Sequence, residues 1–350
     1  MRTHSPDRLR QIGADVFKAA GASESNARRV ANALVDANLA GHDSHGVMHI
    51  PRYVEAINTG VISPGTSPSI LNETPTTALV SGGWTFGQVG AEFATKLGIE
   101  KARTNSVAMV ALIQANHIGR LGEYSEMAIA EGMAAIVAAG GFFPDGGQVA
   151  PFGGAKRAIG TNPVSMGFPG GDTDGMMLDF ATSAIAGGKV RVAVANDSQV
   201  PEGTLIDKDG NPTTDPNTWD AGGALLPAAG HKGYSLALAI EFLGGIMTNA
   251  WAQDKGGYGG PGFATSGTLF IVMNATAFST GESYGAGADR IIDKMKSVPP
   301  APGFSEVLTP GEPERRSTEQ RLRDGIPVPD TTWTLIRKTA RNLGLPDPDA

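Results

Sequence analysis

The sequence contains no cysteine, and charged side chains are scarce. Because none of the 350 residues is a cysteine, a disulfide scaffold, a thiolate zinc site, an iron–sulfur cluster and a cysteine nucleophile are excluded. Charged residues make up 18% of the chain, and 28 Lys and Arg against 35 Asp and Glu give a net charge of −7. Nucleic acids and anionic membrane surfaces attract basic proteins, so neither is an expected partner.

Long apolar runs are also missing. No stretch reaches the roughly 18 apolar residues that a membrane-spanning helix needs. The N-terminal segment has the pattern of an amphipathic helix rather than that of a signal peptide. We therefore expect a cytoplasmic protein without a membrane partner. Hydrophobic residues still make up 41% of the chain, enough to bury a core, so a disordered chain is not expected.

Glycine is the residue in excess. The chain has 48 glycines, about twice the usual share of roughly 7%. Many of them form doublets between apolar runs, such as Gly187-Gly188. Because a glycine lets the backbone approach a ligand closely, we expect some of these doublets to line a ligand site.

Hydrophobic periodicity predicts a chain with helical ends. Ser5 and Ser23 are candidate N-caps of two helices, and a third helix covers roughly 47–58. The stretch 61–77 is rich in Pro, Ser and Thr, which is typical of a linker. Helical patterns return after residue 288.

Between these ends, short apolar runs alternate with helical segments. We predict an α/β (α+β) protein of two domains. Residues 1–75 together with 288–350 form a helical substrate and dimerisation domain, and residues 76–287 form an α/β domain. The expected strands are 77–81, 107–113, 135–138, 176–179 and 269–273, and the expected helices lie around 88–103, 121–132 and 232–248.

Two familiar motifs occur in unsuitable contexts. GYGGPG at 257–262 fits the dinucleotide-binding pattern, but no strand precedes it and Pro261 stands where a helix should open. GESYG at 281–285 fits the nucleophile elbow, but that fold needs a histidine after the serine, and His231 is the last one here. Neither motif is interpreted as functional.

Half of the six histidines lie in one segment, GHDSHGVMHIPRY at 41–53. His42, His45 and His49 are spaced by three and four residues, so a helix would place them on one face, as in a metal site. Alternatively, the segment is an active-site turn in which a histidine moves a proton and Ser44 orients it. Arg52 could then bind a carboxylate through two hydrogen bonds. Ordinary surface histidines are the third interpretation.

Further candidate residues follow predicted strands or open helices. His117 comes after the strand 107–113, and the amides of 119–121 open a helix, where anions bind. After Asp179, a small-residue turn with Lys189 and Arg191 suits a pyrophosphate or a ribose. Lys232 stands at a helix start, where the dipole disfavours a cation unless an anion is bound. PGEPE, at 310–314, taken alone reads as helix capping.

Taken together and in order, these segments resemble the type 2 malate/L-lactate dehydrogenases, which do not use the Rossmann fold. The resemblance runs through GHDSHG, NHIGRLG, LDFATSAIAGGKVRVA, GHKGYSLALAIEFLGG and PGEPE, and it covers nearly the whole chain. It implies a non-Rossmann cofactor domain with a mixed sheet, and NAD or NADP as the cofactor. It also implies a 2-hydroxy-acid or 2-oxo-acid substrate and a homodimer.

The resemblance also implies roles for individual residues. His117 or His45 would be the acid/base, with Ser44 beside them, and His45 could instead contact the cofactor. Many members carry arginine at the position of His49, so substrate binding here is expected from Arg52, Tyr53 and His49. The cofactor contacts implied are His45, Gly119, Arg120, Leu121, Met177, Leu178, Asp179, Phe180, Ala181, Lys232, Gly311, Glu312, Pro313 and Glu314.

The prediction is therefore an NAD(P)-dependent oxidoreductase that transfers hydride between a 2-hydroxy acid and a 2-oxo acid. The segment 140–148 departs from the family pattern, which leaves the substrate open. Three alternatives remain. One is a metal-dependent enzyme using His42, His45 and His49. A second is a related reductase acting on a cyclic imine or a diketo acid, and the third is a non-catalytic nucleotide-binding protein.

Overall fold

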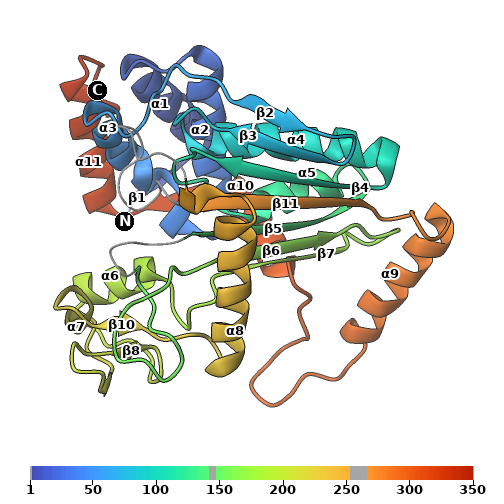
Figure 1. The fold of residues 1–350 in the computed structure, drawn as a ribbon. Helices are drawn as coiled ribbons and strands as arrows, with labels where there is room; N and C mark the ends of the chain where they lie inside the picture. Colours follow the sequence, from blue (N-terminus) through green and yellow to red (C-terminus); the bar gives the residue numbers. More distant parts are fainter. Residues whose placement is uncertain (1, 142–146, 253–265, 350) are drawn as a thin grey trace.

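The computed structural model describes residues 2–141, 147–252 and 266–349. A seven-stranded sheet crosses the molecule (Figure 1) in the order β2-β3-β4-β11-β5-β6-β7. Only β3 and β4 pair in parallel, so the sheet is mixed, and the predicted fold class is confirmed. The strands are β2 (Ser69–Glu73), β3 (Thr77–Ser81), β4 (Val107–Ile113), β5 (Met133–Gly141), β6 (Val164–Phe168), β7 (Met176–Phe180) and β11 (Ser266–Asn274).

Helices cover both faces of this sheet. Helices α4 (Gly87–Asn105) and α5 (Gly122–Ile129) pack on one face, where Val137 of β5 joins their apolar side chains. Ala138, the next residue, packs instead with Ile240 of α8 (His231–Ile240), which a π-helical turn, η3 (Glu241–Ile246), continues. This alternation is the two-residue period of a strand buried on both faces.

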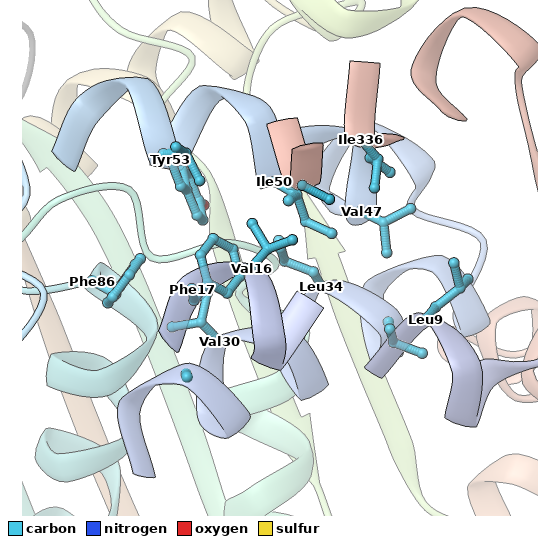
Figure 2. Packing of buried hydrophobic residues seen from close by; sticks show 14 of the residues in the cluster. Leu9, Val16, Phe17, Val30, Leu34, Val47, Ile50, Tyr53, Phe86 and Ile336 are labelled. Carbon is cyan, nitrogen blue, oxygen red and sulfur yellow. The ribbon is translucent and has the colours of Figure 1, made fainter. Parts of the chain in front are cut away.

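The N-terminal helices α1 (Pro6–Ala19), α2 (Glu24–Leu39) and α3 (Ile50–Asn58) form a second core beside the sheet. Ser5 and Ser23 cap α1 and α2, as predicted, by accepting the backbone N–H of Arg8 and of Asn26. C-terminal elements complete this unit, namely α11 (Asp330–Asn342) and β12 (Ile326–Val328), which pairs with β1 (Arg2–His4). Figure 2 shows the buried side chains, among them Leu9, Val16, Phe17, Val30, Leu34, Val47, Ile50, Tyr53, Phe86 and Ile336.

Two other C-terminal helices contribute no side chain to that core. Helix α10 (Glu312–Asp324) packs on α2. Helix α9 (Gly281–Lys296) lies at the opposite end of the sheet in Figure 1, where Asp289 accepts the backbone N–H groups of Gly171, Asp172 and Thr173. The predicted domain boundaries stay a prediction.

A smaller unit lies below the sheet in Figure 1 and surrounds Trp219. Its three short strands pair in the order β10-β8-β9. Its elements are α6 (Gly187–Ala195), β8 (Leu205–Ile206), β9 (Pro212–Thr213), α7 (Asn217–Asp220) and β10 (Ala224–Leu225).

The predicted strands 77–81 and 107–113 are confirmed as they stand. The linker prediction for 61–77 was wrong in part, because β2 lies there. All five of its residues are exposed at the sheet edge, so no alternation of apolar residues marks it. The stretch 47–58 begins as a 3₁₀ turn before α3.

GYGGPG and most of 140–148 lie outside the described residues. In the described part of the chain, no helix is long and apolar enough to span a membrane.

Candidate active site

The segment between α2 and α3 folds around one side chain, Asn38. Its Oδ1 accepts the backbone N–H of Val47 at 2.8 Å, and its Nδ2 donates to Asp43 at 2.6 Å. A Cβ on Gly46 would lie only 2.1 Å from Asn38 Oδ1, so this position must be glycine. The result is two successive 3₁₀ turns, η1 (Asp43–His45) and η2 (Val47–His49), rather than a continuous helix.

These turns send the three histidines to different partners. His45 Nδ1 lies 3.0 Å from Ser44 Oγ, and His49 donates from Nε2 to the carbonyl of Ser44 at 2.8 Å. His42 Nε2 lies 3.3 Å from Glu314 at the start of α10. A continuous helical face of histidines is therefore not formed. Among the described ranges, no three His, Asp or Glu side chains gather as metal ligands would.

His117 reaches the same place from the end of β4. The side chain of the preceding residue, Asn116, donates to the carbonyls of Val61, Trp84 and Thr85, which fixes the turn. The ring centroid of His117 lies 5.6 Å from that of His45 and 5.0 Å from that of His49. Its Nδ1 is 2.7 Å from the hydroxyl of Tyr53 on α3. The structure thus brings together four predicted site residues from two distant segments.

The cluster is a low-dielectric environment. Burial lowers the pKa of His45 and of His49 to about 4, and the neighbouring imidazoles contribute for His45. Burial also lowers the pKa of His117 well below its usual value, and it raises the pKa of Tyr53. All three rings are therefore neutral near pH 7, and charge introduced here is poorly solvated.

Two arginines stand at the exposed side of the cluster. Arg52, on α3, is exposed, and its charge contributes to the lowered pKa values of His49 and His117. Arg191 acts on His49 in the same way from α6, where its guanidinium lies 5.5 Å from the ring centroid of Trp219. The start of α6 is in contact with the turn, because a Cβ on Gly188 would lie 2.8 Å from that of Ser44. The sequence pattern predicts a phosphate or ribose contact for Arg191, whereas in the structure its charge acts on His49.

Three of the predicted cofactor segments meet at a second location. Asp179 Oδ2, on β7, accepts the backbone N–H of Gly122 at 2.7 Å and lies 3.8 Å from Arg120 Nε. The N–H of Met177 donates to the carbonyl of Pro310 at 3.2 Å, which joins β7 to the PGEPE segment. A cavity of about 420 Å³ opens here, lined by Asp36, Leu39, Arg120, Glu126, Asp174, Glu314, Arg315, Thr318 and Glu319.

The chemistry of this second location fits a dinucleotide. Arg120 is only 5% exposed, and although it pairs with Glu126, its Nε has no hydrogen-bond partner among the described residues. A buried guanidinium with an unused donor suits a phosphate oxygen. The carboxylates of Asp179 and Glu314 can accept hydrogen bonds from ribose hydroxyls. Phe180 is half exposed and adds an apolar ring.

Two of the predicted cofactor residues, Lys232 and Glu312, do not line this cavity. Lys232 is exposed at the start of α8, at the end of that helix farthest from the sheet in Figure 1. The carboxylate of Glu312 binds Lys296, Arg316 and the backbone N–H of Thr309. Gln88 is a site residue that the sequence motifs do not predict, and its side chain donates to the hydroxyl of Tyr53 at 2.9 Å. It stands near the start of α4 in a sequence with no motif to mark it.

The comparisons with known proteins point to one enzyme family. The malate/L-lactate dehydrogenase family model matches residues 4–337. L-sulfolactate dehydrogenase from Methanocaldococcus jannaschii is 37% identical over 341 residues, covering 97% of each chain. Hydroxycarboxylate dehydrogenase B from Escherichia coli (strain K12) is 37% identical over 340 residues, covering 95% of this chain and 92% of that protein.

Solved structures of related enzymes have the same fold. Sulfolactate dehydrogenase from Methanocaldococcus jannaschii superposes with a TM-score of 0.89 and covers 99% of both chains. A Δ1-piperideine-2-carboxylate reductase from Pseudomonas syringae, 26% identical, superposes with a TM-score of 0.85, covering 97% of this chain and all of that one. The resemblance inferred from the motifs is confirmed: the chain belongs to the malate/L-lactate dehydrogenase family and is an oxidoreductase of the hydroxy-acid/oxo-acid class.

Proposed function

We propose that the protein is an NAD(P)-dependent dehydrogenase that interconverts a 2-hydroxy acid and a 2-oxo acid at the cluster of His45, His49 and His117. One observation carries the proposal. A partly buried imidazole, His117, is bonded through Nδ1 to Tyr53 at 2.7 Å and lies beside cations that can receive a carboxylate. A 2-hydroxy acid needs both of these partners, one for its hydroxyl proton and one for its negative charge.

The residues divide the work as follows. The nicotinamide supplies the hydride acceptor or donor when the cofactor is bound. His117 exchanges the proton of the substrate oxygen, and Ser44 orients His45 next to it. Arg52 binds the carboxylate, with Arg191 as a second cation on the same side. Partial burial of the cluster reduces the access of water to the reacting atoms and strengthens these contacts.

The cofactor is proposed to extend from this cluster into the cavity beside Arg120. Arg120 and the amides of 119–121 would bind its phosphates, and Asp179 and Glu314 would bind a ribose. His42, paired with Glu314, connects the turn at 41–46 with the PGEPE segment and so links the two sites. Both NAD and NADP are compatible with this set of donors and acceptors.

A substrate panel tests the function. Pyruvate, oxaloacetate, sulfopyruvate and a cyclic imino acid are each supplied with NADH and with NADPH, and loss of nicotinamide absorbance is followed. We expect turnover of at least one 2-oxo acid. Turnover of the cyclic imine alone would favour the related reductase, to which the Pseudomonas syringae structure lends weight. Cofactor binding without any turnover would identify a non-catalytic nucleotide-binding protein.

The role of His117 has its own test. His117→Ala should lower kcat by roughly 10²–10⁴, the contribution of a positioned acid or base. His231→Ala, which removes an exposed histidine on α8, is the control and should leave kcat unchanged. Near-normal kcat in both His117→Ala and His45→Ala would show that neither ring is the acid/base.

We further propose that the protein is a homodimer. Leu238, Phe242 and Ile246 recur every four residues along α8 and η3, and each is at least 40% exposed. Met247 and Trp251 extend the exposed row, at 58% and 52%. A contiguous apolar row of this kind is typical of a protein interface. We assign it to a second copy of this chain.

A further inference from the structure

A third side chain belongs to the Tyr53–His117 pair. Gln88 Nε2 donates to the hydroxyl of Tyr53 at 2.9 Å, and that hydroxyl is 2.7 Å from His117 Nδ1. Gln88 is fully buried, and its other polar atom, Oε1, has no hydrogen-bond partner in the described part of the chain. An unsatisfied buried carbonyl is costly to folding, so the orientation of this amide calls for an explanation.

The hydrogen bonds that link Gln88, Tyr53 and His117 determine which nitrogen of His117 carries the proton. A phenolic hydroxyl has one proton to donate. Because Gln88 donates to the oxygen of Tyr53, the proton of Tyr53 is directed at His117 Nδ1. Nδ1 must then be the unprotonated nitrogen, and the neutral ring carries its proton on Nε2. The opposite orientation of the amide would reverse both hydrogen bonds and move the ring proton to Nδ1.

We propose that Gln88 is a positioning residue that fixes Tyr53 as a donor to His117, so that Tyr53, acting through the neutral imidazole, is the proton source for reduction. This rests on the proposed function, in which His117 protonates the substrate oxygen. As the new C–H bond forms at C2 of the oxo acid and the carbonyl π bond breaks, the oxygen takes the Nε2 proton. His117 Nδ1 takes the phenolic proton in return.

The charges of this step balance. The imidazole begins and ends neutral, and Tyr53 is left as a phenolate that accepts the N–H of Gln88. Water returns the proton after the product leaves. An alkoxide is a stronger base than a phenolate, so the transfer is favourable even though burial raises the pKa of Tyr53 above its usual value near 10. No imidazolium is needed, which suits a ring whose positive form the site disfavours.

The charged and titratable groups around Tyr53 and His117 also favour this direction of proton transfer. His45 and His49 approach His117 from the turns η1 and η2, and Arg52 acts on it from α3. All three lower the pKa of His117, in addition to burial. Arg52 and the Gln88 hydrogen bond lower that of Tyr53, against the larger effect of burial. His45, His49 and Arg52 therefore oppose an imidazolium, and Arg52 and Gln88 favour a phenolate.

The first test uses the unmodified protein. In ¹⁵N spectra without substrate or cofactor, His117, assigned by comparison with His117→Gln, should carry its proton on Nε2. In steady-state reduction, kcat/KM for the oxo acid should stay level from about pH 5 to 9 and fall only as Tyr53 ionises. An Nδ1-protonated ring would overturn the proposal. So would a rate that falls about tenfold per pH unit above the His117 pKa, as an imidazolium donor requires.

The second test removes the amide. Gln88→Met keeps the length of the side chain but loses the donor that stabilises a phenolate, and hydrogen bonds to charged groups correspond to roughly a 10- to 150-fold effect. We expect kcat to fall by that factor, KM for the oxo acid to stay the same, and the His117 tautomers to mix. Tm should be preserved or raised, because the variant also removes the unpaired Oε1.

Thr95→Val is the matched control. Thr95 is as buried on α4 as Gln88, but its hydroxyl donates within the helix to the carbonyl of Ala91. This variant should leave kcat and the His117 tautomer unchanged. If His117→Gln abolishes turnover while Gln88→Met alters neither kcat nor the tautomer, the role of Gln88 is refuted and the proposed function stands. If His117→Gln keeps a near-normal kcat, His117 is not the acid/base of the proposed function, whatever tautomer the spectra report.

Discussion

At the scale of single residues, three imidazoles share one site, but their partners give each ring a different use. His49 donates from Nε2 to the carbonyl of Ser44, which leaves Nδ1 as its nitrogen for a substrate contact. His45 faces Ser44 Oγ, and His117 faces the hydroxyl of Tyr53. Of the three, His117 is the ring bonded to a phenol, which is a stronger acid than the serine hydroxyl beside His45.

Arg52 is the proposed partner of the substrate carboxylate. Arg52 is exposed beside the cluster, and a charge-assisted hydrogen bond contributes about 1.5–3 kcal/mol. Arg52→Ala should therefore lower kcat/KM roughly 10- to 150-fold, since 1.4 kcal/mol is tenfold. Arg52→Lys should recover part of this, because an ammonium lacks the forked donor pair. Steady-state kinetics decides, and unchanged values in both variants would transfer the role to Arg191.

Lys232 gives a second prediction at the scale of single residues. It is exposed at the start of α8, where the helix dipole disfavours a cation unless an anion is bound. Although Lys232 does not line the cavity beside Arg120, its cofactor contact stays a prediction with its own test. Lys232→Ala should weaken cofactor binding by roughly 1.5–3 kcal/mol, the range for a charged hydrogen bond, without loss of Tm in the free protein. Fluorescence titration with NADH and NADPH measures this, with the exposed Lys208→Ala as control. Equal affinities would remove Lys232 from the site.

At the scale of elements, one ion triad joins the N-terminal helices to the helices on the sheet. Arg29 on α2 binds Glu92 on α4 and Glu123 on α5, both at 2.6 Å. The side chains of Arg29 and Glu123 are only 14% and 17% exposed. The triad therefore fixes α2, which precedes the histidine turns, against α5, which follows the His117 segment.

Removing Arg29 should leave the carboxylate of Glu123 buried and unpaired. Breaking a buried pair in this way costs about 3–5 kcal/mol, so Arg29→Ala should lower the free energy of unfolding by that amount at pH 8. Burial already raises the pKa of Glu123, and the loss of Arg29 raises it further. A raised carboxyl pKa favours the neutral folded state as pH falls, so the deficit relative to wild type should shrink at pH 5.

Urea denaturation at both pH values measures this effect. Arg28→Ala is the control, because Arg28 is the exposed neighbour of Arg29 and pairs with Glu24 at the surface. It should change stability little at either pH. A deficit that is equal at pH 5 and pH 8 would contradict a buried, unpaired carboxylate as its cause.

At the scale of the whole molecule, the exposed row on α8 and η3 is the surface proposed to join two copies. Phe242, at its centre, is 57% exposed, so Phe242→Glu should not disturb the core. It should place a charge in the interface and convert the dimer to a monomer in light scattering. Phe278→Glu, at a fully exposed phenylalanine elsewhere, should leave the mass unchanged. A monomeric wild-type protein would refute the assignment directly.

The local features of this protein are determined by the sequence alone. Caps at Ser5 and Ser23, the apolar strands 77–81 and 107–113, and the clustered histidines are visible because each depends on neighbouring residues or a short period. The ordered motifs identified the family for the same reason. A strand such as β2, exposed along its length at the sheet edge, has no such local signal and was read as a linker.

Only the tertiary structure decided which of these features meet. Strand β11 lies between β4 and β5 although it follows both in sequence by more than a hundred residues, and no periodicity encodes that order. Gln88 has an ordinary position on an ordinary helix until packing brings its amide to Tyr53. A proton's position on an imidazole depends on which atoms lie within hydrogen-bond distance, and those atoms come from segments that are joined only by the folded chain.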